Sequence, residues 1–447
     1  MKTPQYLFKL IKSLSEKEKL AILSEWKANC TSSGSIYMSL FNELSKLDDY
    51  DEKKFIIDNA GQPFLKNFSY NKHYLCKKLL TIISKNLCDD DNTESYLIEK
   101  IRTIRFLIAK GLYKHAMLII LKAEKISWNE EYFQEYIIIL NLKKIVTLSL
   151  YKGKKLFQLT DNIYKNIENA QKVLNEIILA SKLNNNLFIL YNSNGYFSDS
   201  FYKKELASIF RNKFYENENK LSVDASVYYY GDKFIQAIDG NDTEICYMYA
   251  RKRYELVKKN NFYSKKYPIS LFASLSDLLH VLLHQKRFKL FEKYFKEFIS
   301  LKHIDYSSKE MWFFEKYFLE VQYNIIQDKH NSVAMIYERF LKERKEYSSV
   351  NFYSNPIIFD LLFLFSYSFL KNKNYTESIR LINQISGDEF KGLNHPLYYS
   401  FSIMKIIIYY KLGFTQNTVS EIKSLKRYLI LKKKLTDFDV KFLGLFI

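Results

Sequence analysis

Glycine and proline are scarce in this chain, with 11 glycines and 5 prolines among 447 residues. An all-β protein needs many turns, and turns draw heavily on these two residues. The scarcity therefore argues against an all-β fold and favours helices joined by short connections. General disorder is excluded as well, because 47% of the residues are hydrophobic and can bury a large core.

Cysteine is also rare, and the four cysteines form no CxxC pair: Cys30, Cys76, Cys88 and Cys246. Their scatter matches neither a disulfide framework nor a zinc site, so we expect free thiols. Long apolar runs are missing too. The densest, Ile357 to Leu370, is shorter than the about 18 residues of a membrane span and carries Asp360.

The first residues reach Lys9 and Lys12 before any apolar run of useful length, which is not the pattern of a secretory signal. Together with the unpaired cysteines and the lack of a membrane span, this pattern predicts a cytoplasmic protein.

Sequence motifs for catalysis are missing as well: there is no GxSxG elbow, GxxxxGK[ST] phosphate loop or GxGxxG turn. We therefore predict no catalytic residues and no cofactor. One enzyme-like pattern stays as an alternative, because Asp277, His280 and His284 share a helical face and the two histidines have the spacing of zinc helices. The glutamate of a HExxH peptidase is replaced by Val281, so ordinary histidines on a helix are the favoured interpretation and no metal site is predicted.

The formal net charge is +19, and the excess of lysine is spread over the whole chain. We interpret it as a bias of composition, with an anionic partner such as nucleic acid or a membrane surface as the alternative. Two basic helices would carry that alternative by contacting phosphates. Their residues are Arg251, Lys252 and Arg253 on one helix, and Lys426, Arg427 and Lys432 on the other. The favoured interpretation is that both clusters are solvated helix faces.

A helical hairpin is clearest between Pro356 and Gly387. Its first half is apolar nearly all round, which predicts a helix buried on most sides. Asn374 and Glu377 have the spacing of a capping box at the start of the second helix. The segment therefore predicts two helices joined by a short polar turn.

Similar turns recur every 40 to 46 residues along the chain. The predicted turn positions are Gly111, Gly153, Gly195, Gly240, Lys286, Lys329, Lys373 and Gly413. A single hairpin cannot bury both its faces, and stacking on the next hairpin completes the burial. The sequence therefore predicts an all-α solenoid of about eight hairpins over residues 93–447. The register is weakest around Gly153 and Gly195, where Asn184 to Asn186 are expected to interrupt a helix.

Residues 1–92 differ in pattern and predict a separate helical module, either a cap for the repeat array or a docking domain. With 14 basic and 12 acidic residues this module lacks the surplus charge of a dedicated DNA reader, although a helix-turn-helix protein stays as an alternative.

The turn formed by Gly111, Tyr113 and Ala116 resembles the joint between the two helices of a tetratricopeptide repeat, although the spacing exceeds the 34 residues usual in that family. Over nearly its whole length the chain is also similar to a group of tetratricopeptide-like helical-repeat proteins of Bacteroidota. The similarity lies in the opening from Leu7 to Lys19 and in the close from Ile408 to Gly413 and from Ser424 to Leu429. The resemblance implies the repeat fold and a cytoplasmic location, and no activity.

Such repeats usually bind a partner on the concave face, which the first helix of each hairpin lines. We predict a scaffold or adaptor that binds a peptide or protein there through exposed aromatic and cationic side chains. The candidates are Tyr229, Tyr230, Lys233, Trp312, Lys316, Tyr323 and Lys405. The alternative for each of these rings is that it fills a seam between helices.

Overall fold

The computed structural model of the chain is helical, and its described residues contain no β-strand. The predicted all-α class is confirmed. The structure describes residues 3–14, 16–28, 34–47, 49–86, 92–192, 199–216, 218, 221–301, 306–344, 356–385, 397–431 and 435–446. These residues form two compact units, called unit 1 (Met1–Trp128 and Gln134–Ile163) and unit 2 (Asn129–Phe133 and Tyr164–Ile447).

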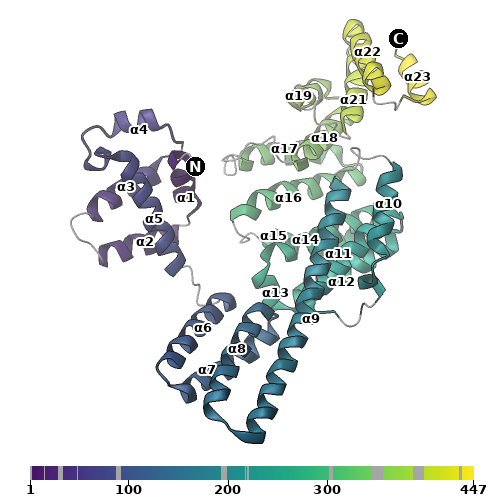
Figure 1. The fold of residues 1–447 in the computed structure, drawn as a ribbon. Helices are drawn as coiled ribbons and strands as arrows, with labels where there is room; N and C mark the ends of the chain where they lie inside the picture. The colour runs from purple at the N-terminus through teal and green to yellow at the C-terminus, as the bar shows by residue number, and fades with distance from the viewer. Residues whose placement is uncertain are drawn as a thin grey trace. The chain divides into compact units, whose positions relative to one another are not determined.

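Unit 1 begins with five helices that share one buried core, formed by residues such as Leu7, Leu40, Phe64 and Leu79. Figure 1 shows α1, α2, α3 and α5 grouped together. The helices of unit 1 are α1 (Thr3–Ser13), α2 (Glu16–Ala28), α3 (Gly34–Lys46), α4 (Glu52–Asp58), the 3-10 turn η1 (Pro63–Leu65), α5 (Phe68–Asn86), α6 (Thr93–Ala109), α7 (Tyr113–Asn129), α8 (Phe133–Leu150) and the start of α9 (Gly153–Asn192).

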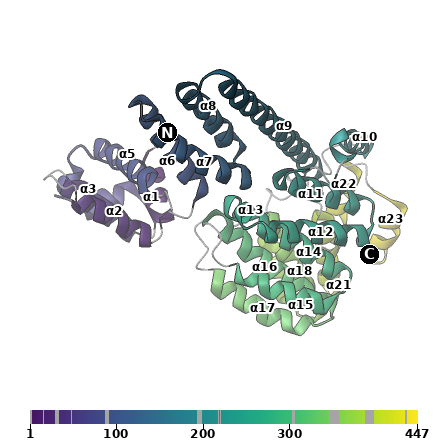
Figure 2. The ribbon, with the colours of Figure 1, turned by 90° about the horizontal axis from the view of Figure 1, so that it is seen from below.

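Unit 2 continues α9 and then stacks helical hairpins in chain order (Figures 1 and 2). Its other helices are α10 (Asp199–Phe210), the 3-10 turn η2 (Lys213–Glu216), α11 (Val223–Asp239), α12 (Thr243–Lys259), α13 (Asn261–Lys266), α14 (Pro268–His284), α15 (Phe288–Ser300), α16 (Tyr306–Ile326), α17 (His330–Glu343), α18 (Pro356–Lys371), α19 (Tyr375–Ile385), α21 (Leu397–Lys411), α22 (Thr415–Leu431) and α23 (Asp437–Gly444). One hydrophobic core runs from Phe234 on α11 to Leu443 on α23, as stacking of repeats requires.

Five hairpins make up this stack in the part of unit 2 that the structure describes, and each consists of a first helix and a second helix. The first helices are α11, α14, α16, α18 and α21, and the second helices are α12, α15, α17, α19 and α22. Neighbouring first helices touch from α14 to α16, from α16 to α18 and from α18 to α21. The chain is therefore an α-solenoid in which side chains on the first helices are close to those of the next hairpin.

The hairpin turns share one backbone motif. At the α6–α7 turn, Gly111 is in the left-handed conformation (φ +72°), its N–H bonds to the Ile108 carbonyl (3.0 Å) and the Leu112 N–H bonds to the Leu107 carbonyl (2.9 Å). This pair of bonds is the Schellman motif, which satisfies carbonyls at the end of a helix. The same pair recurs at five other turns, whose left-handed residues are Asn241, Lys286, Asp328, Lys373 and Gly413.

The structure shifts two of the predicted turn positions by one residue. The left-handed residue is Asn241 and not Gly240, and it is Asp328 and not Lys329. Asparagine and aspartate tolerate the left-handed region better than other side chains, so a glycine is not required there. Lys286, Lys373, Gly111 and Gly413 lie where the spacing predicts them, whereas Gly195 is outside the described residues.

The corrected register has a consistent packing position, five residues after each left-handed residue. All six side chains at this position are buried: Ala116, Cys246, Phe291, Val333, Ser378 and Thr418. At the α18–α19 crossing, Ser378 donates to the Ser366 carbonyl (2.8 Å) and Ser366 donates to the Ser378 carbonyl (3.0 Å). Small residues here let the two helices approach closely enough for these reciprocal bonds.

Helix α9 differs most from the sequence prediction. The turn at Gly153 is present (φ +58°), but the 40 residues that follow form one helix that passes through Asn184 to Asn186 without a break. Asparagine is a poor helix residue because its side chain competes for backbone groups. Here the Asn184 amide donates instead to the Asp232 carboxylate of α11 (2.7 Å). This tertiary contact and the buried Leu183, Leu187 and Leu190 stabilise the continuous helix.

Candidate functional site

Two of the residues predicted to be exposed for binding are buried. Tyr229 is 5% exposed and its ring packs against Phe214, while Trp312 is 4% exposed and its Nε1 donates to the Phe298 carbonyl (3.1 Å). The prediction that these two rings are exposed is therefore wrong. Each ring instead fills a seam inside unit 2, as the alternative interpretation of these residues expects.

The cationic and aromatic candidates on α16 and α21 have partners within the chain. Lys316 pairs with Glu343 on α17 (2.8 Å), and Tyr323 donates to Glu292 on α15. Both acceptors lie on second helices, so these side chains are directed toward the neighbouring second helices. Lys405 is half-exposed and also has an interaction within the chain. A role for the three in partner binding stays a prediction.

Tyr230 and Lys233 lie at the α11 end of the stack, where both are half-exposed. Tyr230 donates to Glu218 (3.2 Å), and the Lys233 ammonium lies 5.5 Å from the Phe210 ring and 5.3 Å from the Tyr215 ring. Burial lowers the pKa of Lys233, and the nearby Asp232 opposes this shift. These side chains belong to a local aromatic cluster, and their binding role stays a prediction.

Helices α12, α14 and α16 carry a polar cluster that the sequence did not reveal. We call it the α14 cluster: Arg253 on α12, Ser276, Asp277 and His280 on α14, and Glu315 on α16. Arg253 Nη1 lies 2.6 Å from Asp277 Oδ2, and His280 Nε2 lies 2.7 Å from Glu315 Oε1. Ser276 donates to the same Glu315 oxygen. The cluster therefore links three helices through ion pairs and hydrogen bonds.

The electrostatics of the α14 cluster follow from the burial of Glu315, whose side chain is 8% exposed against 35% for His280. Burial opposes the charged imidazole, but the Glu315 carboxylate outweighs it and raises the pKa of His280. Burial likewise opposes the Glu315 carboxylate, yet His280 and Ser276 hold its pKa below the ordinary value. Both shifts favour the ion pair, which has the chemistry of a structural bridge.

A second buried carboxylate lies on α11. Asp232 is fully buried and accepts hydrogen bonds from Asn184 Nδ2 (2.7 Å) and from the Tyr215 hydroxyl (2.7 Å). Burial raises its pKa to about 6, although both donors favour the charged form. Asp232 thereby connects α9, η2 and α11.

Helix α18 carries a different kind of carboxylate. Between Ile358 and Phe369, the half-exposed side chains follow one helical face and all others are buried. We call this face the α18 stripe: Asp360, Phe363, Leu364 and Tyr367. The prediction of a helix buried on most sides is confirmed, and the α18 stripe is the half-exposed part of this stretch.

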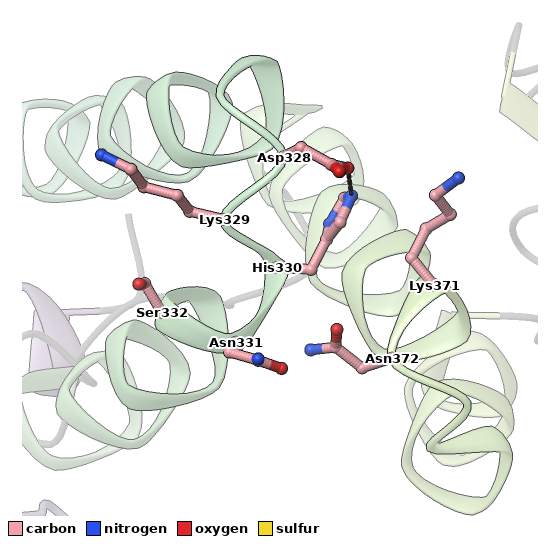
Figure 3. A pocket seen from close by; sticks show the side chains of 7 residues that line it. All are labelled: Asp328, Lys329, His330, Asn331, Ser332, Lys371 and Asn372. Atoms are coloured by element: carbon pink, nitrogen blue, oxygen red, sulfur yellow. Dashed lines mark ion pairs between the residues drawn. The ribbon is translucent and has the colours of Figure 1, made fainter.

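A shallow depression of about 460 Å³ lies beside the α16–α17 and α18–α19 turns (Figure 3). It is lined by Asp328, Lys329, His330, Asn331, Ser332, Lys371 and Asn372. His330 bridges Asp328 (3.2 Å) and Ser368 (3.0 Å). Figure 3 shows the side-chain ends of Lys329 and Lys371 pointing away from one another. The depression therefore lacks the converging cations that would bind an anion.

The basic cluster on α12 is paired with carboxylates. Arg251 pairs with Glu255 (2.7 Å), Lys252 pairs with Glu218 (2.6 Å), and Arg253 belongs to the α14 cluster. These contacts reduce the positive charge available to phosphates.

On α22, Lys426 is half-exposed and Arg427 is exposed, and Lys432 lies outside the described residues. Contact of this second basic cluster with nucleic acid stays a prediction.

The histidine pattern on α14 does not converge on one point. His280 faces Glu315, while His284 is exposed at the end of the helix. Among the described residues, no three His, Cys, Asp or Glu side chains are arranged to hold a metal ion. The described residues therefore give no support to the alternative of a metal-dependent enzyme.

Sequence reasoning missed Glu315 as a member of the α14 cluster, because its partners Ser276 and His280 lie 39 and 35 residues away. Asp360, in contrast, stands out in the sequence. It is the only charged residue in the apolar run from Pro356 to Leu370.

Comparison of the chain with models of protein families and with curated proteins finds no match. In the described parts of the chain, no helix combines the length and the apolar character needed to cross a bilayer.

Proposed function

We propose that this protein is an interaction scaffold that binds a peptide, or a segment of a partner protein, on the first helices of unit 2. The α18 stripe lies at the centre of the proposed surface. It combines two aromatic rings, a leucine and a carboxylate on a helix that is otherwise buried between Ile358 and Phe369. This combination is the observation that carries the proposal, because anchors of this kind dominate protein–protein recognition.

The stacking of the hairpins supports the same proposal. Each repeat packs on its neighbours, so the first helices offer a row of adjacent side chains that an extended or helical segment can follow. His280 on α14 contacts Phe318 on α16 (5.7 Å between ring centroids), and Phe363 on α18 contacts Phe401 on α21 (5.3 Å). Half-exposed rings thus occur along the row and not on α18 alone.

We place the scaffold in the cytoplasm. Cys76 and Cys246 are buried free thiols, which suits a reducing compartment. Fractionation of the native cells with an antibody to the chain tests this part of the proposal.

Replacement of Leu364 by lysine should strongly reduce partner capture, since it places an ammonium group among the apolar atoms of the α18 stripe. The matched control is Met335→Lys, on a methionine of α17 that is 67% exposed. Tagged full-length chains are used to capture proteins from the native host, and the captured proteins are quantified by mass spectrometry. We expect partners of the wild type to fall about tenfold or more with Leu364→Lys and to persist with Met335→Lys.

Circular dichroism and thermal melting establish that both variants fold. Equal recovery of the same partners by wild type and Leu364→Lys would contradict the proposal that the α18 stripe is the binding surface.

A further inference from the structure

Asp360 is placed where a neutral residue would fit the fold better. It lies in the second turn of α18, and residues 358, 359, 361 and 362 on either side of it are buried apolar side chains. Phe363, Leu364 and Tyr367 follow at i+3, i+4 and i+7, so the carboxylate and these side chains share one helical face. The charge therefore lies at one end of the α18 stripe.

Asp360 has no hydrogen bond or ion pair with any described residue. Two buried carboxylates of unit 2, Asp232 and Glu315, contrast with it. Asp232 accepts bonds from Asn184 and Tyr215, and Glu315 is paired with His280 and Ser276. Burial raises the pKa of Asp360 to about 6, and no charge on a described residue contributes to the shift.

At neutral pH this carboxylate is ionised and no described residue compensates its charge, so it reduces the stability of the free chain. Residues that destabilise the fold and make no structural contact in exchange are characteristic of functional surfaces. A cationic group from outside the chain would supply the missing partner.

The aromatic rings on the same helical face as the carboxylate indicate the chemical class of the partner. Phe363 is held edge-on against Phe401 (interplanar angle 88°), and Tyr367 is held edge-on against His330 (70°). A carboxylate that shares a helical face with fixed rings suits a lysine or arginine side chain, which pairs with the charge and packs its stem or guanidinium on the rings. Lys371 shares this helical face but lies about 16 Å along the helix axis from Asp360, too far to pair with it.

We infer that Asp360 receives a lysine or arginine side chain of the bound segment, and that apolar residues next to this cation pack on Phe363, Leu364 and Tyr367. The inference rests on the proposed function and adds the chemical class of the partner. The net charge of +19 repels a cationic segment at long range, so recognition depends on this local contact.

Random twelve-residue peptides displayed on phage, selected on the immobilised full-length chain, provide the probe. Selected peptides are synthesised and their binding is measured by fluorescence anisotropy against the wild type, Asp360→Asn and Glu338→Gln. Glu338 is an exposed carboxylate on α17 and serves as the matched control for loss of one negative charge. Thermal melting confirms that each variant is folded.

We expect the selected peptides to contain a lysine or arginine flanked by apolar residues. Asp360→Asn should weaken their binding about tenfold or more, and Glu338→Gln should leave it unchanged. Replacing the peptide's lysine by norleucine, or its arginine by citrulline, should weaken binding to the wild type and have little further effect on Asp360→Asn.

Two results separate the inference from the proposed function. Peptides that bind Asp360→Asn as tightly as the wild type, yet lose binding to Leu364→Lys, would overturn the inference and leave the binding surface in place. Failure to select any peptide above background, or equal binding to Leu364→Lys, would overturn both.

Discussion

A chain with alanine at position 232 should be about 3 kcal/mol less stable than a chain with asparagine there. Asp232 is fully buried and accepts hydrogen bonds from Asn184 and Tyr215. Asparagine can accept from the Asn184 amide and donate to the Tyr215 oxygen, so both groups keep a partner. Alanine leaves both groups unsatisfied and a small cavity beside them.

The pH dependence of the wild type provides the second half of this prediction. The pKa of Asp232 is raised to about 6 in the folded chain, above its ordinary value of 3.8, because of burial. Between these values the folded chain holds more protons than the unfolded chain, so the contribution of Asp232 to stability falls by about 2–3 kcal/mol as pH rises from 4 to 6. The Asp232→Asn variant should not show this fall in stability.

Urea unfolding at pH 4, pH 6 and pH 7.5, for the wild type and both variants, measures these differences. At pH 7.5 we expect the order Asp232→Asn, wild type, Asp232→Ala, from most to least stable. A wild type that gains stability from pH 4 to 6 relative to Asp232→Asn would show that the fold stabilises the charged carboxylate, and would contradict a pKa raised by burial.

Replacing His280 by alanine should lower the free energy of unfolding by about 2–3 kcal/mol at pH 6, since it removes the cation that faces the buried carboxylate of Glu315. This loss of stability is at the lower end of the range expected when one partner of a buried ion pair is removed, because the imidazole is 35% exposed. Replacing both residues by leucine should cost less than His280→Ala alone, because no buried charge then lacks a partner.

The pH range in which this ion pair stabilises the fold follows from the shifted pKa values of His280 and Glu315. The pKa of His280 is raised above 6.5, so its stabilising contribution is complete below pH 6.5 and is lost as pH rises through the raised value. The pKa of Glu315 is lowered below 4.5, so its contribution is present above pH 4.5 and is lost as pH falls through the lowered value.

We therefore expect the penalty of His280→Ala, measured by urea unfolding, to be largest near pH 5–6.5 and smaller at pH 9. A penalty that is the same at pH 6 and pH 9 would contradict an ion pair between His280 and Glu315.

The sequence was informative about turns because the chain repeats a local motif. Glycine at 111 and 413 marks a left-handed residue directly, and regular spacing extends the pattern to Lys286 and Lys373. The register failed by one residue where Asn241 and Asp328 take the left-handed conformation, since Gly240 and Lys329 beside them fit the spacing equally well.

Tertiary contacts explain what the sequence did not predict. The asparagines of α9 indicate a break, but the bond from Asn184 to Asp232, 48 residues later, keeps the helix continuous. The same reason explains why the partners of two candidate binding residues within the chain were not predicted. Lys316 and Tyr323 look free in the sequence, whereas Glu343 and Glu292 are close to them only after the hairpins stack.

The stability of Asp360→Asn at pH 7.5, in the absence of any partner, tests most directly whether the α18 stripe is kept for binding. The free chain holds a half-buried charge on this stripe, without a stabilising contact among the described residues. Urea unfolding should then show Asp360→Asn to be about 1–2 kcal/mol more stable than the wild type, after allowance for partial exposure of the carboxylate. A less stable Asp360→Asn would show that the carboxylate already has a partner within the fold, and would contradict the claim that this charge awaits a bound segment.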